Sequence, residues 1–353
     1  MKEPIICNNK NNLLLQLHIT GKCNQHCKHC YHNEYGNEPL TFNNIKYIIE
    51  QYKELLQKYN TSKGINERGI INITGGEPFV RKDFIDILEL FNENRKYFSY
   101  GILTNGSFIT DEIAEKLVKF EVNDVQVSVE GSKDTHDMIR GEGNFEKTFK
   151  AIDILNKHKI PTIVSFTASK MNYKEFPLVA EYCKEHNVTR LGSDRLVPIG
   201  NGKNIKEQCL SPEECIEYFM IMKEEQDKAL VDKDCNTEIL MNRALHFIVT
   251  KKSIYGCSAG DSAIVIDEMG NILPCRRMPI KCGNVLEDNL SDVYFNNEIM
   301  NDLRKKDISL GCEKCRFNRT CNGGAKCISY AMYNDYKKAD PFCPLIFYKR
   351  NNN

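Results

Sequence analysis

The first half of the sequence alternates short apolar segments with longer segments whose apolar residues recur at helical spacing. The first of the helical segments runs from Ile45 to Tyr59, and Thr41 stands where its N-cap is expected. Alternation of this kind predicts parallel strands joined by right-handed crossovers, and therefore an α/β barrel or a doubly wound sheet. The predicted strands are residues 13–19, 70–73, 101–103, 125–129, 162–166 and a stretch within 190–197.

A loop with three cysteines follows the first predicted strand. Cys23, Cys27 and Cys30 have the spacing C-x3-C-x2-C, at the end of the strand where α/β folds place their chemistry. Three thiolates in one short loop can converge on one metal centre, and cysteine is the usual ligand of a four-iron cluster. Three protein ligands leave one iron open to chelate a small molecule. The alternatives are unrelated thiols or a partial zinc site, although zinc sites usually match one C-x2-C pair with a second.

Two more strand ends carry residues suited to ligand binding. Gly75, Gly76 and Glu77 follow the second strand, where paired glycines let a ligand approach the backbone and the carboxylate can accept from an ammonium group. A plain turn is the alternative there. Asn105 follows the third strand, where it either contacts a ribose or a substrate or forms an Asn-Gly turn.

A serine and an arginine stand on the fourth strand and in the segment after it. Ser128 lies near the end of this strand, and Arg140 follows twelve residues later. A guanidinium can donate two parallel hydrogen bonds to a carboxylate, and the alternative for Arg140 is a surface charge. We interpret His136 and Asp137, which lie between them, as local loop caps.

Cysteines become frequent again in the last hundred residues. A predicted hairpin at residues 263–273 separates the first two of them, and Ser211 to Glu214 form a capping box in the helical connector before them. Structural zinc is one explanation of the C-x2-C pair, and auxiliary iron–sulfur clusters are the other. The cysteines of this region are Cys257, Cys275, Cys282, Cys312, Cys315, Cys321, Cys327 and Cys343, and we interpret Cys209, Cys215 and Cys235 of the connector as incidental thiols.

Composition excludes several classes of function. The net formal charge is zero, so no basic surface argues for nucleic acid. Residues 1–10 lack an apolar signal core, and no apolar run approaches the ~20 residues of a membrane-spanning helix. We therefore expect a cytoplasmic protein with no membrane partner. In that reducing compartment sixteen cysteines indicate metal ligation rather than disulfides.

The motif C-x3-C-x2-C after a first strand resembles the signature of the radical S-adenosylmethionine (SAM) enzymes. This resemblance implies a partial (β/α)6 TIM-like barrel and a [4Fe–4S] cluster on Cys23, Cys27 and Cys30. SAM would bind the fourth iron, and its reductive cleavage would give a 5′-deoxyadenosyl radical. The family usually has an aromatic residue before the third cysteine, where this chain has His29. The implied SAM contacts are Gly75, Gly76 and Glu77 for the amino group and Ser128 and Arg140 for the carboxylate.

The C-terminal cysteines resemble the pattern of the SPASM domain, an extension of peptide- and protein-modifying radical SAM enzymes. Gly270-x4-Cys275 fits that pattern, whereas Cys327 comes two residues late. The resemblance implies two auxiliary [4Fe–4S] clusters, the second of which keeps an open iron unless Cys282 fills it, since residues 250–255 contain no cysteine. The implied ligands are Cys312, Cys315, Cys321 and Cys343 for one cluster and Cys257, Cys275 and Cys327 for the other. The expected domains are residues 1–205 for the barrel, 206–256 for the helical connector and 257–353 for SPASM.

The resemblance points to a maturase that crosslinks a ribosomal precursor peptide through a thioether or a carbon–carbon bond. One alternative is an anaerobic sulfatase-maturating enzyme that makes formylglycine. That subgroup carries an aspartate after the second SPASM cysteine, where this chain has Arg276 and Arg277. Another alternative is a non-catalytic iron–sulfur or zinc protein for electron transfer or scaffolding, which would need no SAM site.

The interpretation as a maturase also implies partners. They are a peptide or protein substrate and a reductant such as flavodoxin or ferredoxin. About a dozen residues precede the first strand, too few for a precursor-recognition domain, so a separate recognition protein or a short leader is also expected.

Overall fold

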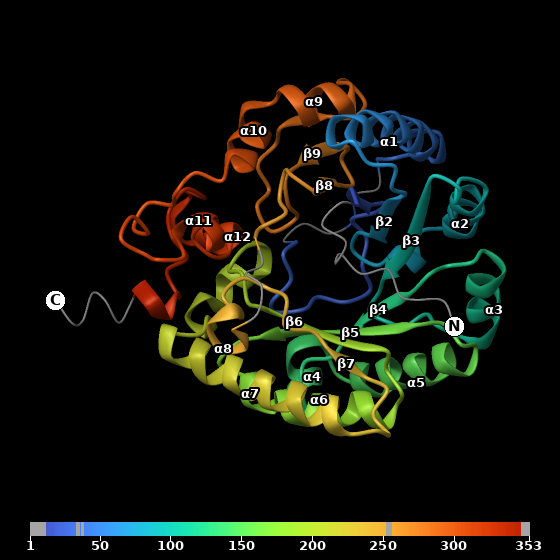
Figure 1. The fold of residues 1–353 in the computed structure, drawn as a ribbon. Coiled ribbons are helices and arrows are strands. Elements are labelled where there is room, and N and C mark those ends of the chain that lie inside the picture. Colours follow the sequence, from blue (N-terminus) through green and yellow to red (C-terminus); the bar gives the residue numbers. More distant parts are fainter. Residues whose placement is uncertain (1–11, 33–35, 37–38, 252–255, 347–353) are drawn as a thin grey trace.

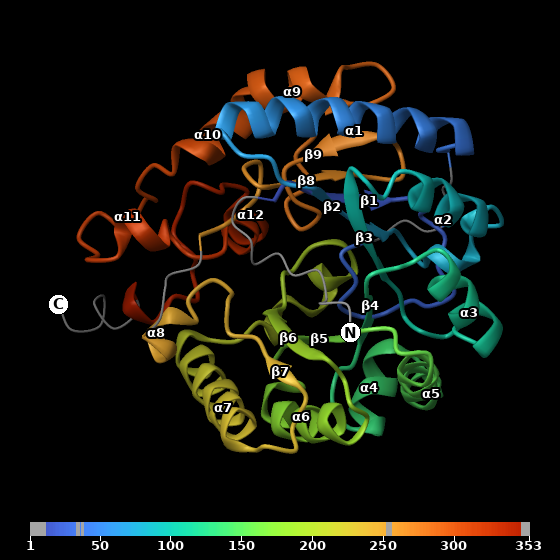
Figure 2. The same ribbon diagram turned by 45° about the vertical axis from the view of Figure 1, so that its right-hand side comes forward.

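The computed structural model describes residues 12–32, 36, 39–251 and 256–346. Within these residues the strands form one sheet of ten, in the order β10-β9-β8-β1-β2-β3-β4-β5-β6-β7. Figures 1 and 2 show that the strands surround an interior and that the helices lie outside them. The strands are β1 (Leu14–His18), β2 (Gly69–Thr74), β3 (Phe98–Leu103), β4 (Val125–Ser128), β5 (Thr162–Ala168), β6 (Arg190–Arg195), β7 (Glu238–Ile239), β8 (Ala263–Ile266), β9 (Asn271–Leu273) and β10 (Gly283–Asn284).

The strands β1 to β6 pair in parallel and in chain order, which confirms the predicted α/β fold with a partial barrel. Each predicted strand is present. The helices are α1 (Phe42–Lys63), α2 (Phe84–Glu93), α3 (Asp111–Lys119), α4 (Lys133–Arg140), α5 (Asn144–Lys157), α6 (Phe176–Glu185), α7 (Pro212–Val231), α8 (Phe247–Thr250), α9 (Leu290–Asn296), α10 (Glu298–Lys305), α11 (Asn318–Cys321) and α12 (Lys326–Tyr333). None of them, within the ranges given above, is long and apolar enough to cross a membrane.

Side chains along the strands alternate between the hydrophobic core under the helices and the interior of the barrel. In β1, Leu15 and Leu17 are fully buried in the hydrophobic core, whereas Gln16 lines an internal cavity. Asn72 of β2 and Gln126 of β4 line the same cavity. Because successive side chains of a strand point to opposite faces, the apolar set packs under the helices and the polar set faces inward. The barrel interior therefore contains a cavity whose wall includes these polar side chains beside apolar ones such as Leu14 and Ile163.

Helix α4 is an element that the sequence did not predict. It contains only two buried residues, His136 and Ile139, so an apolar stripe of helical spacing is missing. Its N-terminus is capped by Ser132, whose side chain accepts a hydrogen bond from Thr135 N. With eight residues, the helix is too short for a repeated apolar pattern to reveal it in the sequence.

The C-terminal region extends the barrel sheet instead of forming a separate layer. The predicted hairpin is present as β8 and β9, and β8 pairs in parallel with β1, from Leu14 opposite Ala263 to Leu17 opposite Ile266. At the other edge β7, in the predicted connector, pairs with β6. The domain limits predicted at residues 205 and 257 stay predictions, but hydrogen bonding of the sheet crosses both of them.

A buried glutamine joins the barrel to the C-terminal helices. Gln51 of α1 donates from Nε2 to the Val285 carbonyl at 2.8 Å, and its Oε1 accepts from Leu290 N at 2.6 Å. Both contacts are buried and span more than two hundred residues of sequence. One side chain therefore satisfies two backbone groups of the segment that leads into α9.

We expect Gln51→Ala to lower the free energy of unfolding by about 2–4 kcal/mol, because it leaves a buried carbonyl and a buried N–H without partners. Glu50→Ala is the matched control, since Glu50 is the neighbouring residue of α1 and its side chain is 65% exposed. Urea denaturation of the anaerobically reconstituted protein measures both changes. Equal stability of the two variants would show that Gln51 does not join the two regions.

Candidate active site

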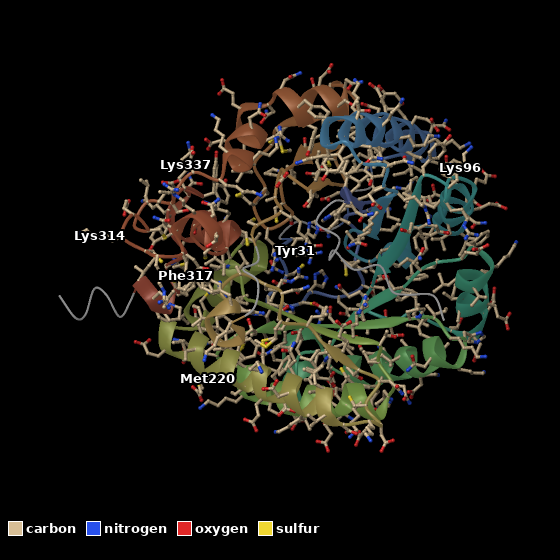
Figure 3. The ribbon with its side chains drawn as sticks, viewed as in Figure 1. Tyr31, Lys96, Met220, Lys314, Phe317 and Lys337 are labelled. Atoms are coloured by element: carbon tan, nitrogen blue, oxygen red, sulfur yellow. The ribbon has the colours of Figure 1, made fainter. Side chains whose placement is uncertain are left out.

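The three cysteines of the first loop line one cavity at the carboxyl end of the parallel strands. The cavity encloses about 1080 Å³ together with its open mouth. Tyr31, which follows Cys30, lies near the centre of the molecule in Figure 3. The structure thus brings Cys23, Cys27 and Cys30 together, as the sequence predicted.

Backbone hydrogen bonds from two neighbouring segments hold this loop. Lys28 N donates to the Ile139 carbonyl of α4 at 3.0 Å. The segment after β6 contributes Gly202 N, which donates to the Cys30 carbonyl at 3.2 Å. The unpredicted helix α4 therefore supports the loop that carries the thiols.

The paired glycines after β2 are required by the close approach of the same loop. Gly76 N donates to the Thr20 carbonyl at 2.7 Å. Gly75 has a φ of 148°, and a Cβ there would lie 2.2 Å from the oxygen of Thr20. A Cβ at Gly76 would lie 2.2 Å from the oxygen of Lys22. Only glycine fits at both positions, and both glycines also line the cavity.

Glu77 has a different environment from the two glycines. Its carboxylate is fully buried and accepts hydrogen bonds from Thr104 Oγ1 at 2.7 Å, Asn105 N at 2.7 Å and Phe79 N at 3.3 Å. Among the described residues it is not part of the cavity wall. Glu77 thus ties the turn after β3 to the end of β2, and its predicted contact with SAM stays a prediction.

Asn105 lines the cavity and also stabilises its own turn. Its Nδ2 donates to Asn24 Oδ1 in the cysteine loop at 2.8 Å. Its Oδ1 accepts from Ser107 N at 2.9 Å. The two alternatives considered for Asn105, turn formation and a place at the cavity, are therefore compatible.

Ser128 and Arg140 both line the cavity, and Arg140 is not a surface charge. Its side chain is 11% exposed and binds Glu130 Oε1 through Nε at 3.0 Å and Nη2 at 2.7 Å. His29 Nε2 lies 3.2 Å from the same oxygen. Arg140 Nη1 also lies 3.8 Å from Cys27 Sγ. The guanidinium is therefore fixed beside the predicted cluster ligands.

Glu130 is a buried carboxylate that keeps its charge. Burial by itself raises its pKa, but its interactions with His29 and with the Arg140 guanidinium more than offset this effect and lower the pKa to about 2. The site therefore contains a fixed ion pair at neutral pH. His136 and Asp137 cap neighbouring backbone groups, as predicted.

The thiols of the loop fit a metal cluster. Burial raises the pKa of Cys23 to about 12 and also raises the pKa of Cys27, where Arg140 partly opposes it. Such thiols stay protonated until a metal replaces the proton. Three thiols, a cavity for a small ligand and a fixed cation match a [4Fe–4S] cluster with one open iron.

The C-terminal cysteines form two groups. In the first, the pKa of Cys327 is raised to about 12, chiefly by burial, and Cys275 and Cys257 add to this shift. In the second, burial raises the pKa of Cys312 to about 11, and Cys343 and Cys315 add to it. Cys321 interacts in the same way with Cys343 and Cys312. The two groups contain the same residues as the two ligand sets that the resemblance implied, and those ligand sets stay predictions.

The interactions of Cys282 set it apart from both groups. Burial alone raises its pKa to about 11, and its Sγ donates to the Ile280 carbonyl at 3.6 Å. No other thiol contributes to that shift, so its predicted role as a fourth ligand gains no support. Residues 252–255, the other region considered for a fourth ligand, lie outside the described residues.

Four charged residues of the site were given no role in the sequence analysis. Glu130 stands two residues after Ser128, and its position just before the segment that ends with Arg140 was the available signal. Asp194, Arg276 and Arg277 also line the cavity. They come from β6 and from the hairpin region, which the sheet brings together but no local pattern does.

The comparison with known families agrees with this geometry. Residues 17–183 match the Radical SAM superfamily, and residues 257–322 match the SPASM iron–sulfur cluster-binding domain. The chain belongs to the radical SAM enzymes with a C-terminal SPASM domain. Its cofactors are accordingly a [4Fe–4S] cluster, SAM and auxiliary iron–sulfur clusters, and the non-catalytic alternative is wrong.

Characterised relatives cover nearly the whole chain. The AdoMet-dependent heme synthase of Methanosarcina barkeri is 26% identical over 94% of this chain and 95% of its own length. The mycofactocin maturase MftC of Mycolicibacterium smegmatis is 25% identical over 94% of this chain and 82% of its own length. The structure of Streptococcus suis SuiB bound to the precursor peptide SuiA has a TM-score of 0.72, with 17% identity over 94% of this chain and 76% of that one. This last likeness shows the fold.

Glu77 makes stability depend on pH. Burial raises its pKa from 4.5 to about 7. The folded protein then holds a proton that the unfolded chain has lost, so the contribution of Glu77 is present below about pH 4.5 and is lost as the pH rises through about 7. We expect Glu77→Gln, which cannot titrate, to gain on the order of 3 kcal/mol relative to the parent between about pH 5 and about pH 8. Urea denaturation at both pH values measures the difference, and a constant difference would contradict the assignment.

We expect Arg140→Ala to weaken SAM binding by about 1.5–3 kcal/mol, the range for a hydrogen bond to a charged group. Arg140→Lys should recover part of the loss, because an ammonium group lacks the planar fork. Equilibrium binding of SAM to the reconstituted variants measures both effects.

The Arg140→Ala variant also leaves Glu130 buried without its cation. The double variant Glu130→Gln, Arg140→Ala removes that charge and serves as the control. If the double variant binds SAM like the parent, Arg140 supports Glu130 and does not bind SAM.

Proposed function

We propose that this enzyme modifies a ribosomally made peptide, joining two of its side chains through a thioether or a carbon–carbon bond. The observation that carries the proposal is a second cavity, which encloses about 1580 Å³ with its open mouth. Its wall includes Cys257, Cys275 and Cys327, the thiols of one predicted auxiliary cluster. A substrate held there would lie between the radical site and those thiols.

The two cavities meet inside the barrel. Asp194, Arg276 and Arg277 belong to the walls of both. Ser165 of β5 and Gln126 of β4 are also shared. A substrate segment in the second cavity would therefore contact residues that also line the cavity where SAM would bind.

The second cavity favours an anionic substrate group. Asp194 and Asp124 are its acidic residues among those described, against the basic residues Arg190, Arg243, Arg276, Arg277 and Lys326. Burial raises the pKa of Asp194, but Arg277, Arg243 and Arg276 more than offset it and lower the pKa to about 2. Even with Asp194 ionised, positive charge is in excess, and a peptide carboxylate would be attracted.

We assign the residues of the first cavity as follows. When the cluster and SAM are bound, the cluster would supply the electron that cleaves SAM, and SAM would supply the radical that abstracts hydrogen. Cys23, Cys27 and Cys30 hold the cluster, and the backbone of Gly75 and Gly76 accepts the SAM ammonium group. Ser128 and Arg140 donate to its carboxylate, and Asn105 faces the ribose. Glu130 keeps the Arg140 guanidinium in place.

We assign the remaining cysteines to two auxiliary clusters, one on Cys257, Cys275 and Cys327 and the other on Cys312, Cys315, Cys321 and Cys343. Their support is the grouping of these thiols by mutual electrostatic interaction. After one hydrogen atom has gone to the 5′-deoxyadenosyl radical, closing the crosslink would release one proton and one electron from the substrate. A nearby cluster would be a suitable acceptor for that electron. A ferredoxin or flavodoxin as reductant and a separate recognition protein remain part of the proposal.

Two alternatives to peptide crosslinking differ in their support. Named relatives include a heme synthase whose length this chain matches, and a porphyrin carries the carboxylates that a basic cavity favours. Modification of a porphyrin is therefore a second candidate function. The sulfatase-maturation alternative finds less support, because Arg276 and Arg277 occupy the position of its characteristic aspartate.

One experiment separates the first two candidates. Reconstituted enzyme, SAM and dithionite are incubated either with the peptide encoded by a small reading frame beside the gene or with Fe-coproporphyrin III. We expect 5′-deoxyadenosine and a peptide lighter by two hydrogens, detected by mass spectrometry. Conversion of the porphyrin with an unchanged peptide would replace the first candidate by the second.

The basic residues of the second cavity give a further prediction. Arg276→Gln should raise the KM of the substrate about tenfold, the effect of losing one charged hydrogen bond. Arg316→Gln is the control, because Arg316 is an exposed arginine of the same C-terminal region. An equal KM in both variants would show that the cavity does not bind the carboxylate.

A further inference from the structure

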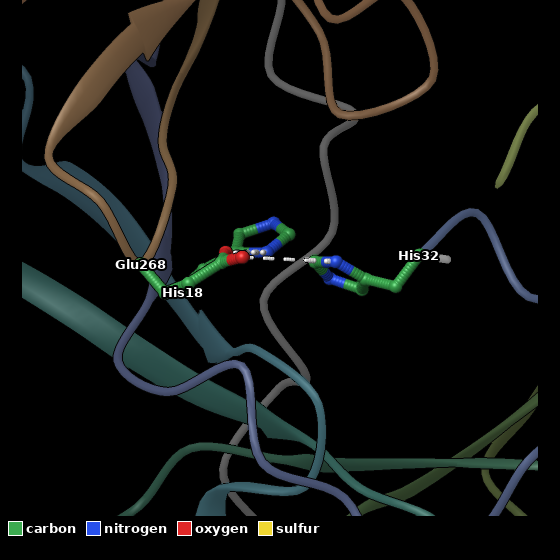
Figure 4. Close-up of side chains that lie close together, drawn as sticks. All are labelled: His18, His32 and Glu268. Carbon is green, nitrogen blue, oxygen red and sulfur yellow. Dashed lines mark ion pairs between the residues drawn. The ribbon is translucent and has the colours of Figure 1, made fainter. Parts of the chain in front are cut away.

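A cluster of two histidines and a glutamate lies beside the cysteine loop and contains no cysteine. The ligand atoms of His18, His32 and Glu268 all lie within 4.8 Å of one another. Figure 4 shows the three side chains pointing toward a common point. His18 ends β1, His32 follows Cys30 by two residues, and Glu268 stands in the turn between β8 and β9.

The distances within this cluster are too long for hydrogen bonds and suit an ion between the groups. His18 Nδ1 lies 3.9 Å from Glu268 Oε2, and His32 Nδ1 lies 3.9 Å from Glu268 Oε1. A direct hydrogen bond would need about 3 Å. Two atoms that each bind Zn²⁺ at about 2.1 Å lie roughly 3.4 Å apart in a tetrahedral site, so small side-chain rotations would complete the geometry.

The burial of His18 provides an independent observation. The residue is 2% exposed, and neither of its ring nitrogens has a hydrogen-bond partner among the described residues. His32 Nε2 is also buried without such a partner. Buried polar atoms are costly unless they are satisfied, and a metal ion satisfies an imidazole nitrogen. The rings of His18, His32 and Tyr31 pack against one another and fix the orientation of His18.

We propose that His18, His32 and Glu268 form a mononuclear site for a divalent metal ion such as Zn²⁺, separate from the three iron–sulfur clusters. Two imidazoles and one carboxylate are a known donor set for Zn²⁺ and for non-haem Fe²⁺. Three protein ligands leave at least one coordination position for water or another small ligand. This site does not depend on which substrate the enzyme modifies.

The location gives the site a specific consequence. β8 is paired with β1, and this pairing places the turn that carries Glu268 beside the end of β1. An ion bound there would join the barrel, the cysteine loop and the C-terminal hairpin. It would hold the segment after Cys30 against the hairpin that leads to Cys275.

Arg276 is the principal opposing charge. It lies over the ring of Tyr31 at 5.3 Å, and its charge acts on both histidines of the cluster. A cation in the site is repelled by this guanidinium and attracted by Glu268. The affinity for zinc should therefore rise when the charge of Arg276 is removed.

The test measures zinc and iron together. The protein is first reconstituted with iron and sulfide, then equilibrated with excess Zn²⁺ and dialysed, and both metals are counted by elemental analysis. We expect the parent and His26→Gln to retain about one zinc per chain, since His26 is an exposed histidine of the same loop. His18→Gln and Glu268→Gln should retain none, with iron unchanged.

The charge of Arg276 gives the second readout. Zinc titration of Arg276→Gln should show about tenfold tighter binding than the parent, a change that a merely structural role of the cluster would not produce. Equal zinc in the parent and in both His18→Gln and Glu268→Gln, at equal iron, would overturn the proposal. If one of these variants fails to load iron, the other decides.

Discussion

The structure depends on the close approach of the cysteine loop to the end of β2. The backbone of the loop sits so near Gly75 and Gly76 that a Cβ at either position would lie 2.2 Å from a carbonyl oxygen. Gly76 N and Glu77 N donate to the carbonyls of Thr20 and Lys22 at 2.7 and 2.8 Å. This contact sets the position of the three thiols, and the cavity below them follows from it.

The buried charges of the site depend on that placement. Glu130 ties Arg140 to a fixed position beside Cys27, and the fold provides α4 to carry this arginine. Farther inside, Asp194 lies 3.3 Å from Arg277, and both residues line both cavities. Because β8 pairs with β1, Cys257, Cys275 and Cys327 are held at the barrel interior. One continuous sheet thus relates the radical site to the auxiliary thiols.

The sequence predicted what local patterns encode. The strands and the capping of α1 by Thr41 follow from periodicity and turn chemistry, and the first cysteine loop follows from its spacing. The sequence did not predict α4, because this helix has only eight residues, of which two are buried. It also did not predict the pairing of β8 with β1, because this pairing joins segments far apart in the chain. For the same reason the sequence analysis gave no role to Glu130 or to Asp194. It predicted that Arg140 binds SAM and kept a surface charge as the alternative.

The central claim is that one chain holds a SAM-cleaving cluster on the first loop and two further clusters on the C-terminal cysteines. The most direct measurement is the iron content and 5′-deoxyadenosine production of the parent and of the variant with Cys23, Cys27 and Cys30 all changed to Ala. We predict about twelve irons and SAM cleavage for the parent, and about eight irons and no cleavage for the variant. Cleavage of SAM by the variant, or about four irons in the parent, would contradict the account.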